Sequence, residues 1–121
     1  MVLEDFYKVS NTSLAGDDAV TSLKVNKEHD IYNGHFPGRP VTPGVVLMQL
    51  FKEEAERIFD KKLQLVRADN VKFTAVFDPT QDAELILESN LTETGEFIKL
   101  KGVAKNNQGI VLKISSLYKA C

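Results

Sequence analysis

One short segment combines the residue types needed to remove a proton next to a carbonyl group. Residues 35–44 read His-Phe-Pro-Gly-Arg-Pro-Val-Thr-Pro-Gly, and they hold one of the two histidines and three of the four prolines. An apolar run typical of a helix follows at once. The Pro/Gly turn can hold His35 as a base, and the free N–H groups at a helix start can stabilise an oxyanion. The segment therefore indicates acid–base chemistry on a carbonyl compound.

Composition and charge limit the class of protein. With 121 residues, 43% hydrophobic and 26% charged, the chain suits one globular domain with a modest core. A net charge of −2 argues against binding to nucleic acid or anionic lipid. The N-terminus is unlike a signal peptide, and no segment approaches the roughly 20 apolar residues that span a bilayer. The one cysteine, Cys121, gives no internal disulfide, which favours a reducing compartment. We expect residues 1–121 to form one cytoplasmic domain with no nucleic-acid or membrane partner and no metal site.

The apolar run after the turn predicts a helix from Pro43 to about Asp60. Thr42 is a plausible N-cap, and proline is favoured at the first helical position. At 100° per residue one broad face is apolar. Its members are Leu47, Met48, Leu50, Phe51, Ala55, Ile58 and Phe59. Glu54 also falls in this apolar arc, without an obvious partner.

The remaining pattern predicts strands. Their ranges are 6–14, 17–25, 63–77, 83–91, 96–105 and 109–119. Turn signals between them include Ala15-Gly16-Asp17, Thr94-Gly95 and Asn106-Asn107-Gln108-Gly109. Residues 26–42 are rich in Asn, Asp, Gly and Pro and predict a long functional loop. A curved antiparallel sheet wrapped around one long helix, in the α+β class, satisfies this order.

Three blocks of sequence carry a resemblance to a known family. They are Asn33-Gly34-His35-Phe36-Pro37-Gly38-Arg39-Pro40 with Pro43-Gly44-Val45, then Asp69-Asn70-Val71-Lys72-Phe73 with Ala83-Glu84-Leu85-Ile86-Leu87-Glu88, then Lys101-Gly102-Val103-Ala104-Lys105. Together they resemble the hot-dog-fold dehydratases of fatty acid biosynthesis, which act on 3-hydroxyacyl groups carried on acyl carrier protein. The likeness spans about residues 24–118 in the family's order.

The resemblance implies an active site shared across a homodimer, with no cofactor. His35 would take the proton on C2 of the acyl thioester, and the backbone N–H of Gly44 would bind the thioester oxygen. The backbone carbonyl of Val41 would orient the imidazole. The substrate-binding residues implied are Phe36, Pro37, Gly38 and Val41. Because the base must be neutral, activity is expected to fall below about pH 6.5.

The chain departs from the family at the acidic position. In the family an acidic residue on the partner chain's helix handles the leaving hydroxyl. The family usually has Glu where this chain has Gln49, and often has Gln one turn later, where this chain has Glu53. An amide binds a hydroxyl group but cannot give up a proton at neutral pH. In the interpretation we favour, Gln49 positions the hydroxyl while His35 moves both protons of a syn elimination. Alternatively, Glu53 supplies the carboxylate from one turn away, or the chain no longer dehydrates its ligand.

Each of these residues also has a purely structural interpretation. Gly44 could simply ease helix initiation, and an N-cap hydroxyl from Thr42 could accept its N–H. Glu53 precedes Arg57 by four residues, the favourable order for a surface ion pair. Gln49 could be an ordinary residue on the polar face of the helix. His29 has charged neighbours and no motif, and we interpret it as a surface loop residue.

Two other functions compete with dehydration. Related hot-dog proteins hydrolyse thioesters by activating water with a carboxylate, and the position of Gln49 or Glu53 could be imagined in that role. The chain could also be a non-catalytic subunit that pairs with an active paralogue, or a binder of acyl carrier protein. Sites shared across a dimer make that division of labour feasible.

Overall fold

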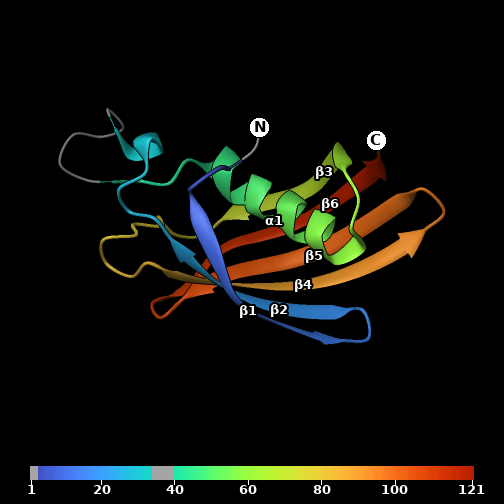
Figure 1. The fold of residues 1–121 in the computed structure, drawn as a ribbon, viewed down its shortest axis with the longest axis horizontal. Coiled ribbons are helices and arrows are strands. Elements are labelled where there is room, and N and C mark those ends of the chain that lie inside the picture. Colours follow the sequence, from blue (N-terminus) through green and yellow to red (C-terminus); the bar gives the residue numbers. More distant parts are fainter. Residues whose placement is uncertain (1–2, 34–39) are drawn as a thin grey trace.

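The computed structural model describes residues 3–33 and 40–121. Six strands form one antiparallel sheet in the order β1-β2-β4-β5-β6-β3, and the sheet curves around the helix α1 (Figure 1). The elements are β1 (Tyr7–Ala15), β2 (Asp18–Val25), the short 3-10 helix η1 (Asp30–Tyr32), α1 (Gly44–Phe59), β3 (Leu63–Phe73), β4 (Glu84–Thr94), β5 (Phe97–Asn106) and β6 (Gly109–Ala120). The predicted α+β class and hot-dog arrangement are therefore confirmed.

The strand boundaries follow the turn signals closely. Gly16 and Gly95 have φ values of +59° and +60°, a conformation that glycine adopts without steric cost. Both therefore support the tight turns that precede β2 and β5. Two strand ends were wrong: β4 continues to Thr94 rather than ending at residue 91, and β3 ends at Phe73 rather than at residue 77. Beyond it the backbone N–H of Thr74 still donates to Val111, whereas Phe77 is buried in the core.

The helix begins one residue later and ends one residue earlier than predicted. Pro43 occupies the N-cap position, with no side-chain hydrogen bond, so the prediction of Thr42 as N-cap was wrong. The hydroxyl of Thr42 instead shares a hydrogen bond with Tyr32 Oη, at 2.8 Å. At the other end, Asp60 adopts the left-handed conformation, and its N–H donates to the carbonyl of Glu56. This is a common way to terminate a helix.

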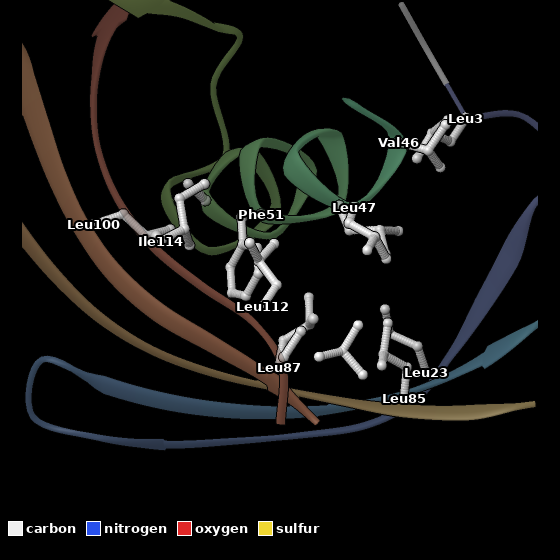
Figure 2. Packing of buried hydrophobic residues seen from close by; sticks show 14 of the residues in the cluster. Leu3, Leu23, Val46, Leu47, Phe51, Leu85, Leu87, Leu100, Leu112 and Ile114 are labelled. Atoms are coloured by element: carbon white, nitrogen blue, oxygen red, sulfur yellow. The ribbon is translucent and has the colours of Figure 1, made fainter. Parts of the chain in front are cut away.

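The inner face of α1 packs on the concave face of the sheet (Figure 2). Leu47 and Phe51 on the helix lie towards Leu87 and Leu112 on the strands, and all four are buried. A Cβ atom on Gly102 of β5 would lie 2.5 Å from Cε1 of Phe51. The helix can therefore approach β5 closely because this position has no side chain. Met48, Ile58 and Phe59, predicted for the same face, are only partly buried.

His29 connects the short helix η1 to the N-terminal segment. His29 is more than a surface loop residue, because its Nδ1 accepts from the N–H of Ile31 at 3.0 Å and its Nε2 lies 2.9 Å from the Glu4 carbonyl oxygen. It therefore acts as the N-cap of η1.

Within residues 3–33 and 40–121, no helix has both the length and the apolar content needed to cross a membrane.

Candidate active site

The structure describes half of the predicted site residues. Val41, Gly44, Gln49 and Glu53 lie at the approach to α1 and along its first three turns. The other four, His35, Phe36, Pro37 and Gly38, lie outside the described residues. The roles inferred for the histidine and its neighbours therefore remain predictions, and the geometry of the helix side can be tested against them.

A buried hydrogen bond joins the two sides of the predicted catalytic turn. Tyr32 precedes the turn and Thr42 follows it, and their hydroxyl oxygens lie 2.8 Å apart. Thr42 is also anchored through its N–H, which donates to the carbonyl of Phe77 at 3.1 Å. Burial raises the pKa of Tyr32 to about 12, so its hydroxyl stays protonated. These contacts fix the backbone that leads into the start of α1.

Gly44 is the first residue of α1, and its backbone N–H and its missing side chain both matter here. Among the described residues, no group accepts its backbone N–H; the hydroxyl of Thr42 bonds Tyr32 instead. An oxyanion donor is therefore compatible with this position. In addition, a Cβ atom here would lie 2.6 Å from Cζ of Phe73, whose ring packs against the helix start. A larger residue would have to displace the half-exposed ring of Phe73, so packing favours glycine here independently of any chemistry.

Gln49 and Glu53 contact each other directly. Gln49 Nε2 donates to Glu53 Oε2 at 3.0 Å, the separation expected for residues four apart on one helix face. The carboxylate accepts two more hydrogen bonds, from the N–H of Leu3 at 3.0 Å and from the hydroxyl of Tyr7 at 2.8 Å. Glu53 is therefore held by three donors. The exchange of Gln and Glu relative to the family pattern keeps an amide–carboxylate pair.

The predicted ion pair between Glu53 and Arg57 was wrong. Arg57 Nη2 donates instead to Oε1 of Glu54, at 2.9 Å, and Arg57 Nη1 donates to the hydroxyl of Tyr7. This gives Glu54, which is 1% exposed, the partner that the sequence did not reveal. Lys52 and Glu56, also four residues apart on the helix, form an ion pair with a separation of 3.6 Å.

Tyr7 links these charged groups and remains neutral. Burial raises the pKa of Tyr7 to about 12, and the hydrogen bond to Glu53 acts in the same direction, whereas Arg57 opposes the shift. The phenol is therefore a hydrogen-bond donor to the carboxylate throughout the physiological range. No local pattern pointed to Tyr7, because it lies 46 positions before Glu53 in the sequence.

A hollow of about 220 Å³ lies beside Gln49. It is lined by Val45, Met48, Gln49, Lys52, Leu65 and Tyr118. Most of these side chains are apolar or aromatic, so the amide of Gln49 lies at an otherwise largely apolar surface. Such a setting suits a polar group that binds one specific hydroxyl beside an acyl chain.

Comparison with known proteins agrees with this architecture. Residues 11–110 match the ApeI-like family, described as ApeI dehydratase. The 3-hydroxyacyl-[acyl-carrier-protein] dehydratase FabZ of Acidovorax sp. (strain JS42) is 30% identical over 98 residues, or 72% of this chain and 65% of the relative. FabZ of Streptococcus equi subsp. zooepidemicus (strain MGCS10565) is 31% identical over 93 residues, or 73% of this chain and 63% of the relative. The chain thus spans less than two thirds of the length of these curated relatives.

Solved structures share the fold at low sequence identity. A chain of the dehydratase heterocomplex ApeI:P from Xenorhabdus doucetiae superposes with a TM-score of 0.73 and 18% identity, over 93% of this chain and 96% of that chain. A hypothetical thioesterase protein with coenzyme A from Streptococcus pneumoniae TIGR4 gives a TM-score of 0.65 and 12% identity, over 94% and 87% of the two chains. At these identities the structural likeness shows the fold alone, whereas the family match covers residues 11–110. The chain belongs to the ApeI-like family of hot-dog-fold 3-hydroxyacyl-[acyl-carrier-protein] dehydratases.

Proposed function

We propose that this chain removes water from (3R)-3-hydroxyacyl thioesters carried on acyl carrier protein and forms trans-2-enoyl thioesters. One observation carries the proposal beyond family membership. Each chain carries a helix start whose first N–H has no acceptor among the described residues and, five positions later, an amide that borders a largely apolar hollow. In a shared site these two groups would come from different chains of the dimer. These are the two polar functions that a hydroxyacyl thioester needs, one for its carbonyl oxygen and one for its hydroxyl.

In the proposed mechanism His35 moves both protons. Its neutral imidazole takes the proton from C2, and the electrons of the C2–H bond form the enolate, whose oxygen accepts from Gly44 N–H. The electrons then form the C2–C3 double bond as the C3–O bond breaks. The imidazolium returns its proton to the departing oxygen, which leaves as water. Gln49 binds the hydroxyl and holds it on the side of C2 from which the proton was taken.

The contacts of Glu53 favour this assignment over one in which Glu53 is the acid. A general acid has to carry a proton and present it to the substrate, whereas both oxygens of Glu53 already accept hydrogen bonds from Leu3, Tyr7 and Gln49. The same contacts disfavour thioester hydrolysis, since that reaction needs a carboxylate that can activate water.

A homodimer with shared sites belongs to the same proposal. Strand β3 lies at the edge of the sheet and carries exposed Leu65, at 45%, beside the helix residue Val45, at 61%. An unpaired edge with exposed apolar side chains is a typical surface for a second copy of a chain. The partner would also close the hollow beside Gln49. Mixing His35→Ala and Gln49→Leu protomers should then restore part of the activity, because mixed dimers contain one intact site.

A turnover assay tests the proposed function. The purified chain is given 3-hydroxyacyl and saturated acyl thioesters on acyl carrier protein, and enoyl product and free thiol are measured separately. We expect enoyl formation that is lost in His35→Ala and that declines below about pH 6.5, where imidazole becomes protonated. Release of thiol without enoyl product would instead identify a thioesterase.

A non-catalytic subunit is the second candidate, and two observations favour it. Gln49 replaces the usual carboxylate, and a structural neighbour of this chain comes from a dehydratase heterocomplex. In that case the pure chain would be inactive, and activity would appear after addition of a paralogue that has Glu at the equivalent helix position. Activity of the pure homodimer, lost in His35→Ala, would exclude this alternative.

A further inference from the structure

We propose that Glu53 is a positioning residue, which sets the orientation of the Gln49 amide and is itself held by the N-terminal segment. The inference deepens the proposed function, because it assigns the way in which Gln49 faces the substrate hydroxyl. It rests on a continuous set of contacts that runs from Arg57 through Tyr7 and Glu53 to Gln49.

Arg57 and Glu53 determine which atom donates in each of these hydrogen bonds. A guanidinium has donors and no acceptor, and a carboxylate accepts and does not donate. Tyr7 must therefore accept from Arg57 and donate its own proton to Glu53 Oε1, 2.8 Å away. The raised pKa of Tyr7 agrees with a phenol that keeps this proton.

The carboxylate then determines which side of the Gln49 amide faces it. Nε2 lies 3.0 Å from Glu53 Oε2. In the flipped amide an oxygen would take that place, and two acceptors would face each other without a proton between them. The Nε2 atom of Gln49 is thus directed towards Glu53. The Oε1 atom of the same amide therefore points away from the carboxylate.

The N-terminal segment holds the Glu53 carboxylate in this position and disfavours other side-chain rotamers. The N–H of Leu3 donates to the same oxygen that Gln49 uses, at 3.0 Å, and the side chain of Leu3 is buried in the core. Backbone N–H groups have no alternative rotamer, so this bond fixes the position of Oε2 more firmly than a surface lysine could. Residues far from α1 in the sequence therefore hold a helix side chain in place.

The consequence for catalysis is a specific hydrogen-bonding role. An amide oxygen can accept up to two hydrogen bonds, so Gln49 Oε1 is suited to accept from the O–H of a 3-hydroxyacyl group. A hydroxyl that donates to Gln49 has its own lone pairs available for the proton returned by His35. An acceptor of this kind favours 3-hydroxyacyl over saturated acyl groups, since the latter have no hydroxyl to donate.

Substitutions at position 53 separate orientation from acid catalysis. Glu53→Met keeps the length of the side chain and removes the acceptor, so position 53 no longer opposes a flip of the Gln49 amide. We expect kcat to fall by up to about 100-fold, with a smaller change in KM, because a reacting group that is slightly misplaced loses this much. Glu53→Gln keeps an acceptor for Leu3 and Gln49 while its NH₂ group can donate to Tyr7, so its kcat should stay within about tenfold of the original value, or 1.4 kcal/mol.

A second readout does not depend on turnover. The side-chain NH₂ resonances of Gln49 are identified by their loss in Gln49→Leu and then followed by ¹H–¹⁵N NMR. Glu53→Met should shift these resonances, because it removes the carboxylate that accepts from Nε2, whereas Glu53→Gln should change them less. Glu56→Met is the matched control, because Glu56 lies on the same helix and bonds Leu63 rather than Gln49. Both the resonances and kcat should stay unchanged in this control.

The outcomes distinguish the inference from the function on which it rests. Unchanged Gln49 resonances in folded Glu53→Met would overturn the positioning role. A loss of several hundredfold in kcat for Glu53→Gln would overturn it as well, by making Glu53 the working acid. If Glu53→Met does not fold, Glu53→Ala carries the test: it also removes the acceptor that Gln49 uses, and an unmoved Gln49 signal contradicts the inference. Absence of turnover in the original protein, with the expected NMR shifts, would refute the proposed function and leave the orientation supported.

Discussion

Restoring the residue usual in the family at position 49 probes the site most directly. In Gln49→Glu a carboxylate oxygen replaces the amide nitrogen, 3.0 Å from Oε2 of Glu53. Two full charges at that distance repel by about 5.5 kcal/mol at an effective dielectric constant of 20. The two carboxyl groups therefore share one proton at a pH where an isolated glutamic acid is ionised. The variant gains a proton donor beside the hollow, and we expect dehydration to be kept or raised.

The paired variant Gln49→Glu/Glu53→Gln relieves the repulsion at a defined cost. The amide at position 53 can donate to the new carboxylate at position 49 and can accept from Tyr7, but Leu3 N–H then faces an NH₂ group. Leu3 is 7% exposed, and an N–H left without an acceptor there costs about 1 kcal/mol or more. The double variant should thus be active and slightly less stable than the original chain.

The assay is a four-member cycle of the original chain, both single variants and the double variant. Values of kcat/KM report on the site, and urea unfolding at several pH values reports on the shared proton. The folded-state pKa of the pair in Gln49→Glu is raised, so its contribution to the free energy of unfolding is present at low pH and is lost as the pH rises. The double variant should lack this pH dependence. Complete loss of turnover in folded Gln49→Glu would refute the shared-site reasoning, and a pH-independent stability would refute the close contact between positions 49 and 53.

Three further predictions concern stability and can be measured by urea or thermal unfolding. Gly102→Ala should destabilise the protein by about 1–3 kcal/mol, because its Cβ would lie 2.5 Å from the ring of Phe51 in a filled core. Arg57→Met should cost about 3 kcal/mol at most, since it leaves the buried carboxylate of Glu54 without its ion-pair partner. The third concerns Tyr32, whose pKa burial raises to about 12: its contribution to stability should be intact below about pH 10, the usual tyrosine pKa, and be lost as the pH rises towards about 12.

Each of these has a control. Phe51→Leu should relieve part of the cost of Gly102→Ala, and a cost unaffected by the smaller side chain would contradict the overpacking. Lys52→Met removes a partly exposed pair and should cost under about 1 kcal/mol, so an equal loss in both variants would argue against burial as the cause at Arg57. Tyr32→Phe should weaken the alkaline decline; because Tyr7 is shifted in the same direction, part of that decline should remain.

Contacts between neighbouring residues made much of the fold predictable. Glycines at positions 16 and 95 adopt positive φ angles, so the turns before β2 and β5 could be predicted from sequence. The apolar period of α1 identified its buried face, including Leu47 and Phe51. These features depend on conformational preferences within a few residues, which is why the predicted element order and class agree with the structure.

The sequence predicted which residues belong to the site, but it did not predict which residues they contact. Gln49 and Glu53 were identified because they are exchanged relative to the family. The predicted partner of Glu53 was wrong, and its contacts with Leu3 and Tyr7 were not predicted. The spacing to Arg57 suggested an ion pair with Glu53, whereas the structure pairs Arg57 with Glu54. A helix permits both the three- and four-residue spacings, and burial of Glu54 decides between them.

The sequence by itself determined the elements, the turns and the residue types that can do chemistry, because these follow from local backbone preferences and side-chain composition. The tertiary structure decided that β3 lies next to β6 at the sheet edge and that Leu3 and Tyr7 reach Glu53 from 50 and 46 positions away. Such contacts form because burial of the core brings distant segments together, and no local pattern records which partners they will meet. The orientation proposed for Gln49 depends on those distant partners.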